Sequence, residues 1–423
     1  MKKVLSLLLT LMLLMGLATT AAAEATELTI WSPLTGAKAD TFDKLITAFN
    51  ESQSDVHVTH VSQGSYSILR QKMAGAFNAG NMPQMLVCDY IDVPLFAQRG
   101  MLVDMTEVLD QTTLDDFFSG MMVDLTINGT VYAVPYNRTT QGFIVNKDLL
   151  KEAGIDRVAA SWEEYYEDAK KFKDAMGEGY YYGFAYFNQY IYDAIAASFG
   201  VKMLDENGNV NLINEDMKEM FSFFQKMYEE DLLVMVPTLS GSFAEQFSPF
   251  LEKKVATVFQ SSSFVSSART ILDCDWGFEY MPSGKAGYAV TIGGTNVAVS
   301  STANEAERKA AQAFLEYLNA PESGATVFME ASQLPVRKAT LELDSVKDFC
   351  AENPWTENLL AQIDHAVVAN PITKNIGDVY SLTNDMIVRI IYNGEDMDEV
   401  LGEFTETFQE TIDSARENDE YVE

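Results

Sequence analysis

The side chains most often used in acid–base catalysis and metal binding are scarce in this sequence. Histidine occurs only as His57, His60 and His365. His57 and His60 lie in a segment that alternates like a β-strand, where a spacing of three places two side chains on opposite faces of the sheet. No His-Glu-x-x-His motif is present. We therefore expect neither a metal site nor a cofactor.

Nucleophilic catalysis also lacks a sequence signature. No Gly-x-Ser-x-Gly elbow occurs, and Gly293 and Gly294 are not followed by the Gly-Lys-Ser/Thr ending of a phosphate loop. With 62 acidic residues, a pair of carboxylates for glycoside cleavage is compatible with the sequence. Only the distance between the two carboxyl groups in the folded protein would identify such a pair. We predict no catalytic residue, with a secreted glycoside hydrolase as the alternative from another class.

One aromatic segment has the composition of a carbohydrate-binding surface. Flat aromatic rings stack on the C–H faces of sugars while amides bond hydroxyl groups. A buried aromatic strand explains the same composition equally well, so both interpretations stay open. The aromatic residues are Tyr180, Tyr181, Tyr182, Phe184, Tyr186, Phe187, Tyr190 and Tyr192, with Gly183, Asn188 and Gln189 among them.

The three cysteines, Cys88, Cys274 and Cys350, are too few for a disulfide framework in a chain of this size. We expect buried free thiols, although one bridge is compatible with the number. The net charge of -33 argues against binding to nucleic acid or anionic membranes, since both would repel the chain.

The N-terminus predicts export. Lys2 and Lys3 precede an apolar run, and small residues end at Ala23, which together indicate a signal peptide over residues 1–23. No cysteine for lipid attachment follows the run. We therefore expect a cleaved, unlipidated protein that is periplasmic or extracellular, and the remaining length fits two domains.

Strands and helices alternate along the first part of the mature chain. The pattern predicts strands over 27–31, 56–61 and 84–88 and helices over 40–50 and 67–77. Such alternation indicates a mostly parallel, doubly wound sheet. Further along, Ser161 and Glu164 form a predicted capping box, a helix is expected over 304–318, and residues 205–208 form a turn.

Two segments look like crossings between domains, namely 135–137 (Pro-Tyr-Asn) and the glycine-rich 282–294. A chain that leaves one domain and later returns to it needs two or three such crossings. No internal repeat and no low-complexity segment occurs.

Collinear short motifs resemble the extracellular solute-binding proteins of carbohydrate-type ABC importers, and among them the binders of glycerol 3-phosphate. Each motif is weak alone, but their order is kept over essentially the whole mature chain. They are Leu28–Trp31, Phe49-Asn50, Gly64-Ser65-Tyr66, residues 135–137, Asn146-Lys147-Asp148, Trp162-Glu163-Glu164, Ile292-Gly293-Gly294 and Leu334-Pro335.

The resemblance implies an α/β, two-lobed periplasmic-binding-protein fold of type II, with doubly wound sheets joined by a hinge. It implies a monomer that holds a small carbohydrate ligand between the lobes and presents it to the transmembrane subunits of an ABC permease, without catalysis. We expect residues 24–136 with 292–335 to form one lobe, and 137–291 with 336–423 to form the other.

The same resemblance implies a set of ligand-binding residues. Tyr66, Asp89, Thr139, Ser261 and Gly294 match contacting positions, and each offers a ring face or a hydrogen-bonding group. Asp89 and Trp31 end strands, where doubly wound folds place ligands, although Asp89 could equally cap a helix and Trp31 could be core. The predicted set is Trp31, Tyr66, Asp89, Thr139, Ser261, Gly294 and Gln333.

Two positions depart from the glycerol-phosphate pattern. Gln333 stands where a contacting tyrosine is found, and 373–377 (Thr-Lys-Asn-Ile-Gly) has no arginine in register for the phosphate. A guanidinium offers a bidentate fork that asparagine and threonine do not replace, although Arg138 or Lys374 could supply charge from another direction. We therefore favour a neutral sugar or oligosaccharide over a glycerol phosphate.

Overall fold

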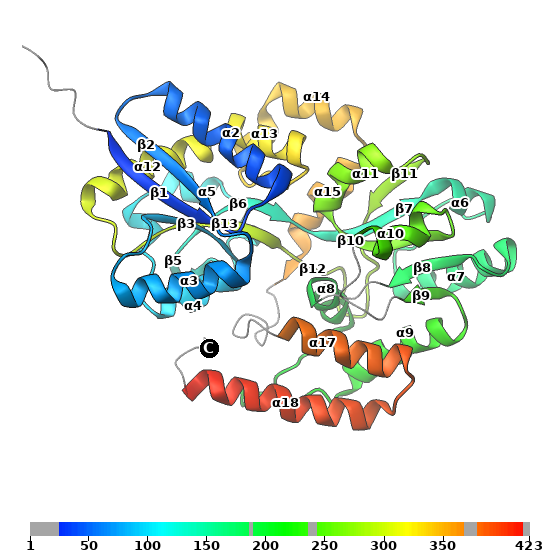
Figure 1. Cartoon of the computed structure of the whole chain (residues 1–423). Coiled ribbons are helices and arrows are strands. Elements are labelled where there is room, and N and C mark those ends of the chain that lie inside the picture. Colours follow the sequence, from blue (N-terminus) through cyan, green and yellow to red (C-terminus); the bar gives the residue numbers. More distant parts are fainter. Residues whose placement is uncertain (1–24, 186–188, 236–242, 368–378, 418–423) are drawn as a thin grey trace, which may run out of the picture.

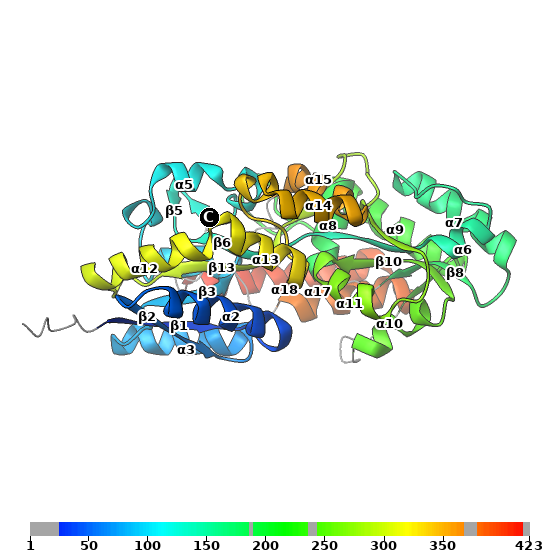
Figure 2. The same ribbon diagram turned by 90° about the horizontal axis from the view of Figure 1, so that it is seen from above.

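The computed structural model describes residues 25–185, 189–235, 243–367 and 379–417. The predicted signal peptide and the segment 373–377 lie outside the described residues. Two five-stranded sheets organise the chain, and Figures 1 and 2 show them at the centres of two lobes lying side by side. This two-lobed α/β architecture is the one expected from the sequence.

The first sheet contains the predicted strands near the N-terminus. The β2, β1 and β3 strands run parallel, whereas β13 is antiparallel to both β3 and β6. All five residues of β3 are buried, as expected for a strand covered on both faces. In spatial order the strands are β2 (Val56–Ser62), β1 (Thr26–Ser32), β3 (Met85–Asp89), β13 (Gly293–Val299) and β6 (Val134–Thr139).

Helices cover both faces of this sheet. Helix α2 (Gly36–Ser52) buries Phe42, Leu45, Ile46 and Phe49 in the larger core, which also contains α12 (Glu305–Leu318). Helix α3 (Tyr66–Ala79) and α4 (Asp92–Gln98) enclose a second apolar cluster on the opposite face. The helical spacing of the apolar residues therefore predicted the correct elements, with boundaries a few residues longer.

The second sheet also mixes parallel and antiparallel pairs. Strand β10 pairs parallel with β8 and antiparallel with β7. In spatial order the strands are β11 (Trp276–Glu279), β7 (Gln141–Asn146), β10 (Val255–Ser261), β8 (Tyr181–Ala185) and β9 (Leu233–Met235). The associated helices are α6 (Lys147–Glu152), α7 (Trp162–Met176), α8 (Gln189–Phe199), α9 (Glu215–Glu229), α10 (Phe243–Leu251) and α11 (Val265–Ile271).

The predicted capping box at Ser161 and Glu164 is confirmed in part. The Ser161 hydroxyl accepts the Glu164 N–H at 3.2 Å, but the Glu164 carboxylate accepts the N–H of Ala160 rather than that of Ser161. Half of the expected capping box is therefore displaced by one residue. Asn304 and Glu307 form a complete capping box at the start of α12.

The turn at 205–208 is confirmed, whereas the thiols follow the prediction only in part, because Cys88 is buried but Cys274 and Cys350 are partly exposed. Leu204 and Val210 bridge across the turn, and the Asp205 N–H donates to the Asn209 carbonyl. Cys88, Cys274 and Cys350 are free, so the bridge that the sequence allowed is absent.

Two strand connections join the sheets. The chain passes from β6 in the first sheet to β7 in the second between Thr139 and Gln141. It returns between β12 (Val290–Thr291) and β13, at Ile292. Residues 135–137, expected to form a crossing between domains, instead lie within β6, directly before the crossing.

The segment after β13 packs first on one lobe and then on the other. Val336 accepts the Phe118 N–H, and Arg337 pairs with Asp116 at 2.7 Å, so η4 stays beside the first lobe. Helix α15 then contacts β11 of the second lobe. The elements are α13 (Pro321–Ala331), η4 (Lys338–Glu342), α14 (Asp344–Glu352), α15 (Trp355–Ala361), η5 (Gln362–His365) and β14 (Ala366–Val367).

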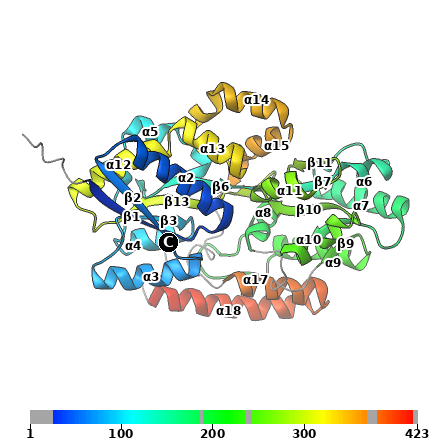
Figure 3. The same cartoon turned by 45° about the horizontal axis from the view of Figure 1, so that its top comes forward.

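The C-terminal helices α17 (Val379–Ile387) and α18 (Met397–Glu417), with the π-helical turn η6 (Val388–Tyr392) between them, lie along α8 and α9 (Figure 3). None of the helices in the described ranges combines the length and apolar character needed to cross a bilayer. The remaining short elements are η1 (Met105–Glu107), α5 (Gln111–Asp116), η2 (Ser119–Met121), β4 (Thr126–Ile127), β5 (Thr130–Val131) and η3 (Ser262–Phe264).

Candidate functional site

Five of the seven predicted ligand-binding residues lie on adjoining segments where the two sheets meet. Asp89 ends β3 and faces Thr295 of β13, while Gly294 faces Arg138 of β6. Thr139 is the last residue of β6 and Ser261 the last of β10. The Leu334 N–H donates to the Arg138 carbonyl at 2.8 Å, which places Gln333 beside the end of β6.

Tyr190, at the start of α8, contacts both strand crossings. Its hydroxyl lies 3.1 Å from the Thr139 Oγ1 at the end of β6, and its ring packs against Gly293 of β13. Burial raises the pKa of Tyr190, and the hydrogen bond with Thr139 opposes the rise only in part. The phenol is therefore neutral at physiological pH and joins α8 to both strand crossings.

The two glycines of β13 allow this close packing for different reasons. A Cβ at Gly293 would lie 2.6 Å from the Tyr190 ring, so a side chain there would displace the tyrosine. Gly294 has φ of +100°, and its Cβ would lie 2.0 Å from the Asn137 carbonyl oxygen. Both positions therefore require glycine, in the place where the sequence predicted a backbone contact at Gly294.

Asp89 is a buried acid whose carboxylate is incompletely satisfied. Among the described residues its Oδ1 has no hydrogen-bond partner. Burial, and then the nearby Asp92 carboxylate, raise the pKa of Asp89 from 3.8 to about 7, while Arg70, Arg138 and the Ile91 N–H oppose the rise. An unsatisfied buried acceptor of this kind is what a ligand hydroxyl can occupy.

Asp92 is held by an arginine on the neighbouring helix. The Arg70 Nε donates to the Asp92 Oδ1 at 2.5 Å. Burial raises the pKa of Asp92, and Arg70 opposes that effect. The pair ties the start of α4 to α3, whose first residue is the predicted contact Tyr66.

Arg138 is the charged group nearest to the predicted site, but the protein already uses its terminal nitrogens. The side chain is fully buried, with Nη1 donating to Asn296 Oδ1 at 2.8 Å and Nη2 to the Ile292 carbonyl at 3.0 Å. Burial lowers the pKa of Arg138, while Asp124 and Asp89 oppose this. Only Nε lacks a partner among the described residues. Two of the five guanidinium N–H groups are thus directed at protein oxygens.

The other predicted residues have different surroundings. Gln333 is fully buried, and its Oε1 has no partner within the described part of the chain while its Nε2 donates to the Ala331 carbonyl. Trp31 is partly buried against the second apolar cluster, which favours a packing role. Tyr66 is partly buried at the first position of α3.

The aromatic segment divides between core and site. Tyr182 and Tyr192 are buried in the larger core, and Tyr180 and Tyr181 pack against it, whereas Tyr190 reaches Thr139. Residues 186–188, which include two of the aromatic residues, lie outside the described ranges. The core interpretation is confirmed for Tyr182 and Tyr192, and the carbohydrate-binding interpretation stays a prediction. Sequence reasoning missed Tyr190 as a single position because no spacing separates it from its neighbours.

A second polar network has the connectivity of a serine hydrolase triad. The Ser32 Oγ lies 2.5 Å from His60 Nε2, and His60 Nδ1 lies 2.6 Å from Asp43 Oδ1. Ser32 has no exposed surface, and its Oγ already accepts the Leu34 N–H. A substrate therefore has no access to this hydroxyl in the structure. As predicted, His57 and His60 are on opposite faces of β2, with His57 exposed.

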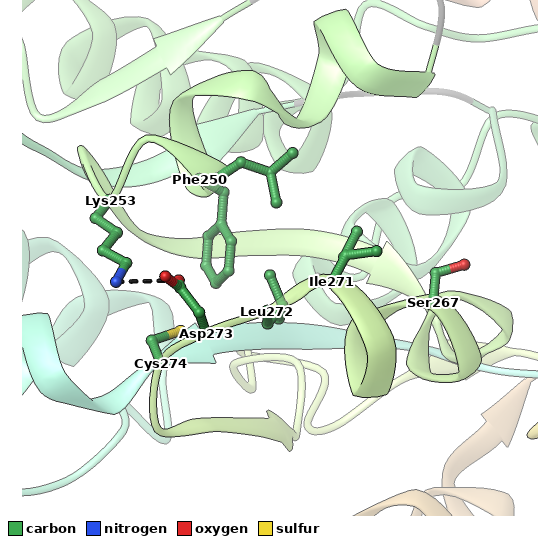
Figure 4. A pocket seen from close by; sticks show the side chains of 8 residues that line it. Phe250, Lys253, Ser267, Ile271, Leu272, Asp273 and Cys274 are labelled. Atoms are coloured by element: carbon green, nitrogen blue, oxygen red, sulfur yellow. Dashed lines mark ion pairs between the residues drawn. The ribbon is translucent and has the colours of Figure 1, made fainter.

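Three surface cavities lie away from these residues. A cavity of about 540 Å³ lies beside α10 and α11 and is lined by Phe250, Leu272 and Cys274. The Lys253–Asp273 ion pair, with 3.0 Å between Nζ and Oδ1, borders it, and Figure 4 shows these side chains. A second of about 530 Å³ adjoins the start of α12, and a third of about 500 Å³ adjoins Trp162. We place the site by its converging polar groups, because none of these cavities is lined by a predicted contact.

Within the described ranges, no group of three or more His, Cys, Asp and Glu side chains has the arrangement of a metal site. The polar atoms at the predicted site are hydroxyl, amide, carboxylate and backbone groups. This set suits hydrogen bonding to a small polar molecule.

Known proteins share both the sequence pattern and the fold. Residues 44–354 match the model of the bacterial extracellular solute-binding protein family. The sn-glycerol-3-phosphate-binding periplasmic protein UgpB of Agrobacterium fabrum is 24% identical over 397 residues, which cover 89% of this chain and 88% of that protein.

Two solved structures have the same fold. UgpB from Mycobacterium tuberculosis in complex with glycerophosphocholine has a TM-score of 0.80 at 21% identity, covering 92% of this chain and 99% of that one. The cyclic alpha-maltosyl-1,6-maltose binding protein from Arthrobacter globiformis has a TM-score of 0.76 at 19% identity, covering 93% and 100%. The match over most of its length shows that this chain belongs to the bacterial extracellular solute-binding protein family.

Proposed function

We propose that this chain is the substrate-binding protein of an ABC importer and that it captures a neutral sugar or oligosaccharide outside the cytoplasm. The observation that carries the proposal is the buried Asp89 carboxylate, whose Oδ1 is unsatisfied beside Gly294 and Thr295. A carboxylate accepts hydrogen bonds from ligand hydroxyls, and Gln333 Oε1 offers a second unsatisfied acceptor.

Acceptors at this site favour a neutral ligand over an anion. A phosphate brings only acceptor oxygens and a negative charge, which Asp89 and Asp92 would repel. Arg138 directs its terminal nitrogens to Asn296 and Ile292. Relatives named for glycerol 3-phosphate and a fold relative bound to glycerophosphocholine support the second candidate, a glycerophosphate derivative. The free Arg138 Nε is the group that would serve it.

The mechanism we propose is closure of the two lobes on the ligand. A ligand that contacts both lobes binds the closed state more tightly than the open one and shifts the population toward it. The crossings at Thr140 and Ile292 supply two hinge segments, and we infer a third between α14 and α15, where contacts change from one lobe to the other. The closed form would then be presented to the permease.

We infer that no bond is made or broken in this mechanism. Among the described residues, Ser32 is the one nucleophile that hydrogen-bonds to a histidine, and it is inaccessible to a substrate. We further infer that the chain acts as an exported monomer. The net charge of -33 disfavours nucleic acid. The basic and apolar pattern of residues 1–23 supports a cleaved signal peptide and a periplasmic or extracellular location.

A thermal-shift screen followed by calorimetry tests the ligand and the site together. The screen should identify ligands among mono-, di- and oligosaccharides, sn-glycerol 3-phosphate and glycerophosphocholine, and calorimetry then measures their affinities. Asp89→Asn should then weaken the best neutral ligand by roughly thirtyfold, or about 2 kcal/mol, through loss of a charged hydrogen bond.

The matched control is Asp156→Asn, an exposed acid in the second lobe, which should bind like the unmodified protein. Equal affinity in the two variants would remove Asp89 from the site. Thermal stabilisation by the phosphorylated compounds alone would replace the neutral ligand with the glycerophosphate candidate, and product release from any sugar would favour the hydrolase.

A further inference from the structure

The cavity of about 500 Å³ in the second lobe has an aromatic lining that comes from three helices. Trp162 and Tyr166 belong to α7, Phe199 to α8 and Phe223 to α9. The Phe223 ring packs against the other three, with ring centroids 5.7 to 6.4 Å apart. Trp162 and Phe199 are buried, whereas Tyr166 and Phe223 are only partly buried. The cavity therefore presents aromatic surface to the solvent.

The glycine-rich segment 282–294 supplies one wall of this cavity through Ser283 and Gly284. The Ser283 carbonyl accepts the Trp162 N–H at 3.1 Å, and the Trp162 Nε1 donates to the Ser198 Oγ at 2.9 Å. A Cβ at Gly284 would lie 2.3 Å from the Ser198 carbonyl oxygen, so this close approach requires glycine. The wall is thus fixed to α7 and α8, and the cavity is preformed, as small-molecule sites usually are.

Charged side chains of both signs complete the lining, namely Glu163, Glu219, Lys226 and Lys285. The Lys285 Nζ pairs with the Glu219 Oε2 at 2.6 Å, and the Lys226 Nζ lies 4.2 Å from the centroid of the Tyr166 ring. Two acids and two lysines give this lining no net formal charge, in a chain whose net charge is -33. The charge of the lining therefore favours neither an anion nor a cation.

This lining matches a neutral ligand that has an apolar face and several hydroxyl groups. The C–H face of a sugar can pack on the accessible ring of Phe223, while Lys226 can donate to a hydroxyl and Glu163 can accept from one. A purely apolar ligand would remove the charged groups from water without replacing their hydrogen bonds, which costs free energy. The volume also lies in the range of roughly 300–1,000 Å³ that small-molecule sites have.

We propose that this cavity is a second saccharide-binding site, separate from the site at Asp89. None of the predicted ligand-binding residues lines the cavity, so the two sites should bind independently. Packing on an aromatic ring does not distinguish one glycosidic linkage from another, so the second site should accept disaccharides of different linkage. This inference rests on the proposed function for the class of its ligand and deepens it by adding a site.

The second site is measured in the Asp89→Asn background, where the first site is weakened. Maltose and cellobiose are the probes, titrated to millimolar concentration and followed by saturation-transfer NMR. Both should bind, and the further change Phe223→Ala should weaken their binding about tenfold, because the accessible ring is lost. Phe77→Ala is the matched control, since Phe77 is a partly buried ring in the first lobe, and it should leave the binding unchanged.

Glu163→Ala is a second variant that leaves the packing intact, because Glu163 is exposed. It should weaken both disaccharides about fivefold through loss of a hydrogen-bond acceptor, whereas Glu167→Ala, one turn further along α7, should not. Circular dichroism checks the fold of Phe223→Ala, and Glu163→Ala decides the question if that variant does not fold.

The proposal is overturned if Asp89→Asn binds neither disaccharide, or if folded Phe223→Ala binds both as tightly as the Phe77→Ala control. Displacement of nothing but L-phenylalanine from this cavity would likewise assign it to a zwitterionic ligand and overturn the proposal. The proposed function fails separately, when the protein with Asp89 intact binds no saccharide more tightly than Asp89→Asn does.

Discussion

Asp89, the acid on which the proposed binding site depends, carries a cost to stability. The residue is only 9% exposed and lies near Asp92. Among the described residues, the Oδ1 of its carboxylate has no hydrogen-bond partner. Burying a charge without full compensation is unfavourable, so the folded protein holds the proton of Asp89 up to about pH 7. Retaining such a group is understandable where a ligand completes its hydrogen bonds.

The raised pKa predicts a specific pH dependence of the ligand-free protein. Between about pH 4 and pH 7 the folded state keeps the Asp89 proton that the unfolded state releases, so the stability conferred by this group falls as pH rises. The full penalty, up to about 4 kcal/mol at about 1.4 kcal/mol per pKa unit, is present above pH 7 and absent below pH 4.

Chemical denaturation of the unmodified protein and Asp89→Asn at pH 4.5 and pH 8 measures this penalty. Asparagine does not titrate, so the variant should gain stability relative to the unmodified protein as pH rises. The pKa of Asp92 is also raised, and Asp92 is present in both proteins. The stability of the variant should therefore still fall as pH rises, but less steeply than that of the unmodified protein. A stability difference that is the same at both pH values would show that Asp89 is ionised throughout.

At the scale of elements, the Ser32, His60 and Asp43 network fastens α2 to the first two strands. Ser32 is the last residue of β1, His60 lies on β2 and Asp43 on α2. The imidazole also packs edge-on against Phe42, with ring centroids 5.1 Å apart. The same hydrogen-bond order that activates a serine in a hydrolase here connects three elements, because the serine is sealed from solvent.

His60→Ala should lower the free energy of unfolding by about 2–4 kcal/mol, since it removes two hydrogen bonds and the aromatic contact. His57→Ala, an exposed position on the same strand, should change it by less than about 0.5 kcal/mol. Urea unfolding followed by circular dichroism compares the two. Similar losses in both variants would mean that the network contributes little.

At the scale of the whole molecule, the lobes are joined where β6 and β13 lie side by side. Gly293 pairs with Thr139 and Gly294 with Arg138, so both chain crossings meet at the same place. Arg138 reinforces the junction by donating to the Ile292 carbonyl within the returning crossing. The lobe closure proposed above would therefore have to leave this pairing intact and bend the chain on either side of it.

Gly294→Ala should destabilise the protein by several kcal/mol, because its Cβ would overlap the Asn137 carbonyl and φ of +100° is unfavourable for alanine. Gly129→Ala isolates the backbone cost, since Gly129 has φ of +85° and no atom near its Cβ, and it should lose only about 1 kcal/mol. Thermal unfolding of both variants measures the difference. Equal losses would show that β13 shifts to admit the methyl group.

The sequence by itself determined the elements and much of their order. Apolar spacing predicted α2 and α3, and alternation predicted β1 and β2, because secondary structure depends on patterns within a few residues. Collinear motifs indicated the solute-binding family and brought Asp89, Thr139, Ser261, Gly294 and Gln333 forward as one set.

Tertiary structure alone decided how the polar groups are used. Tyr190 bonds Thr139 across 51 residues, Arg138 reaches Asn296 across 158, and His60 reaches Ser32 across 28. No local pattern encodes such pairings, since a hydrogen bond depends on the distance and angle between atoms that only the packed chain brings together. The sequence could therefore identify residues capable of binding, while the fold decided which of them are already occupied by the protein itself.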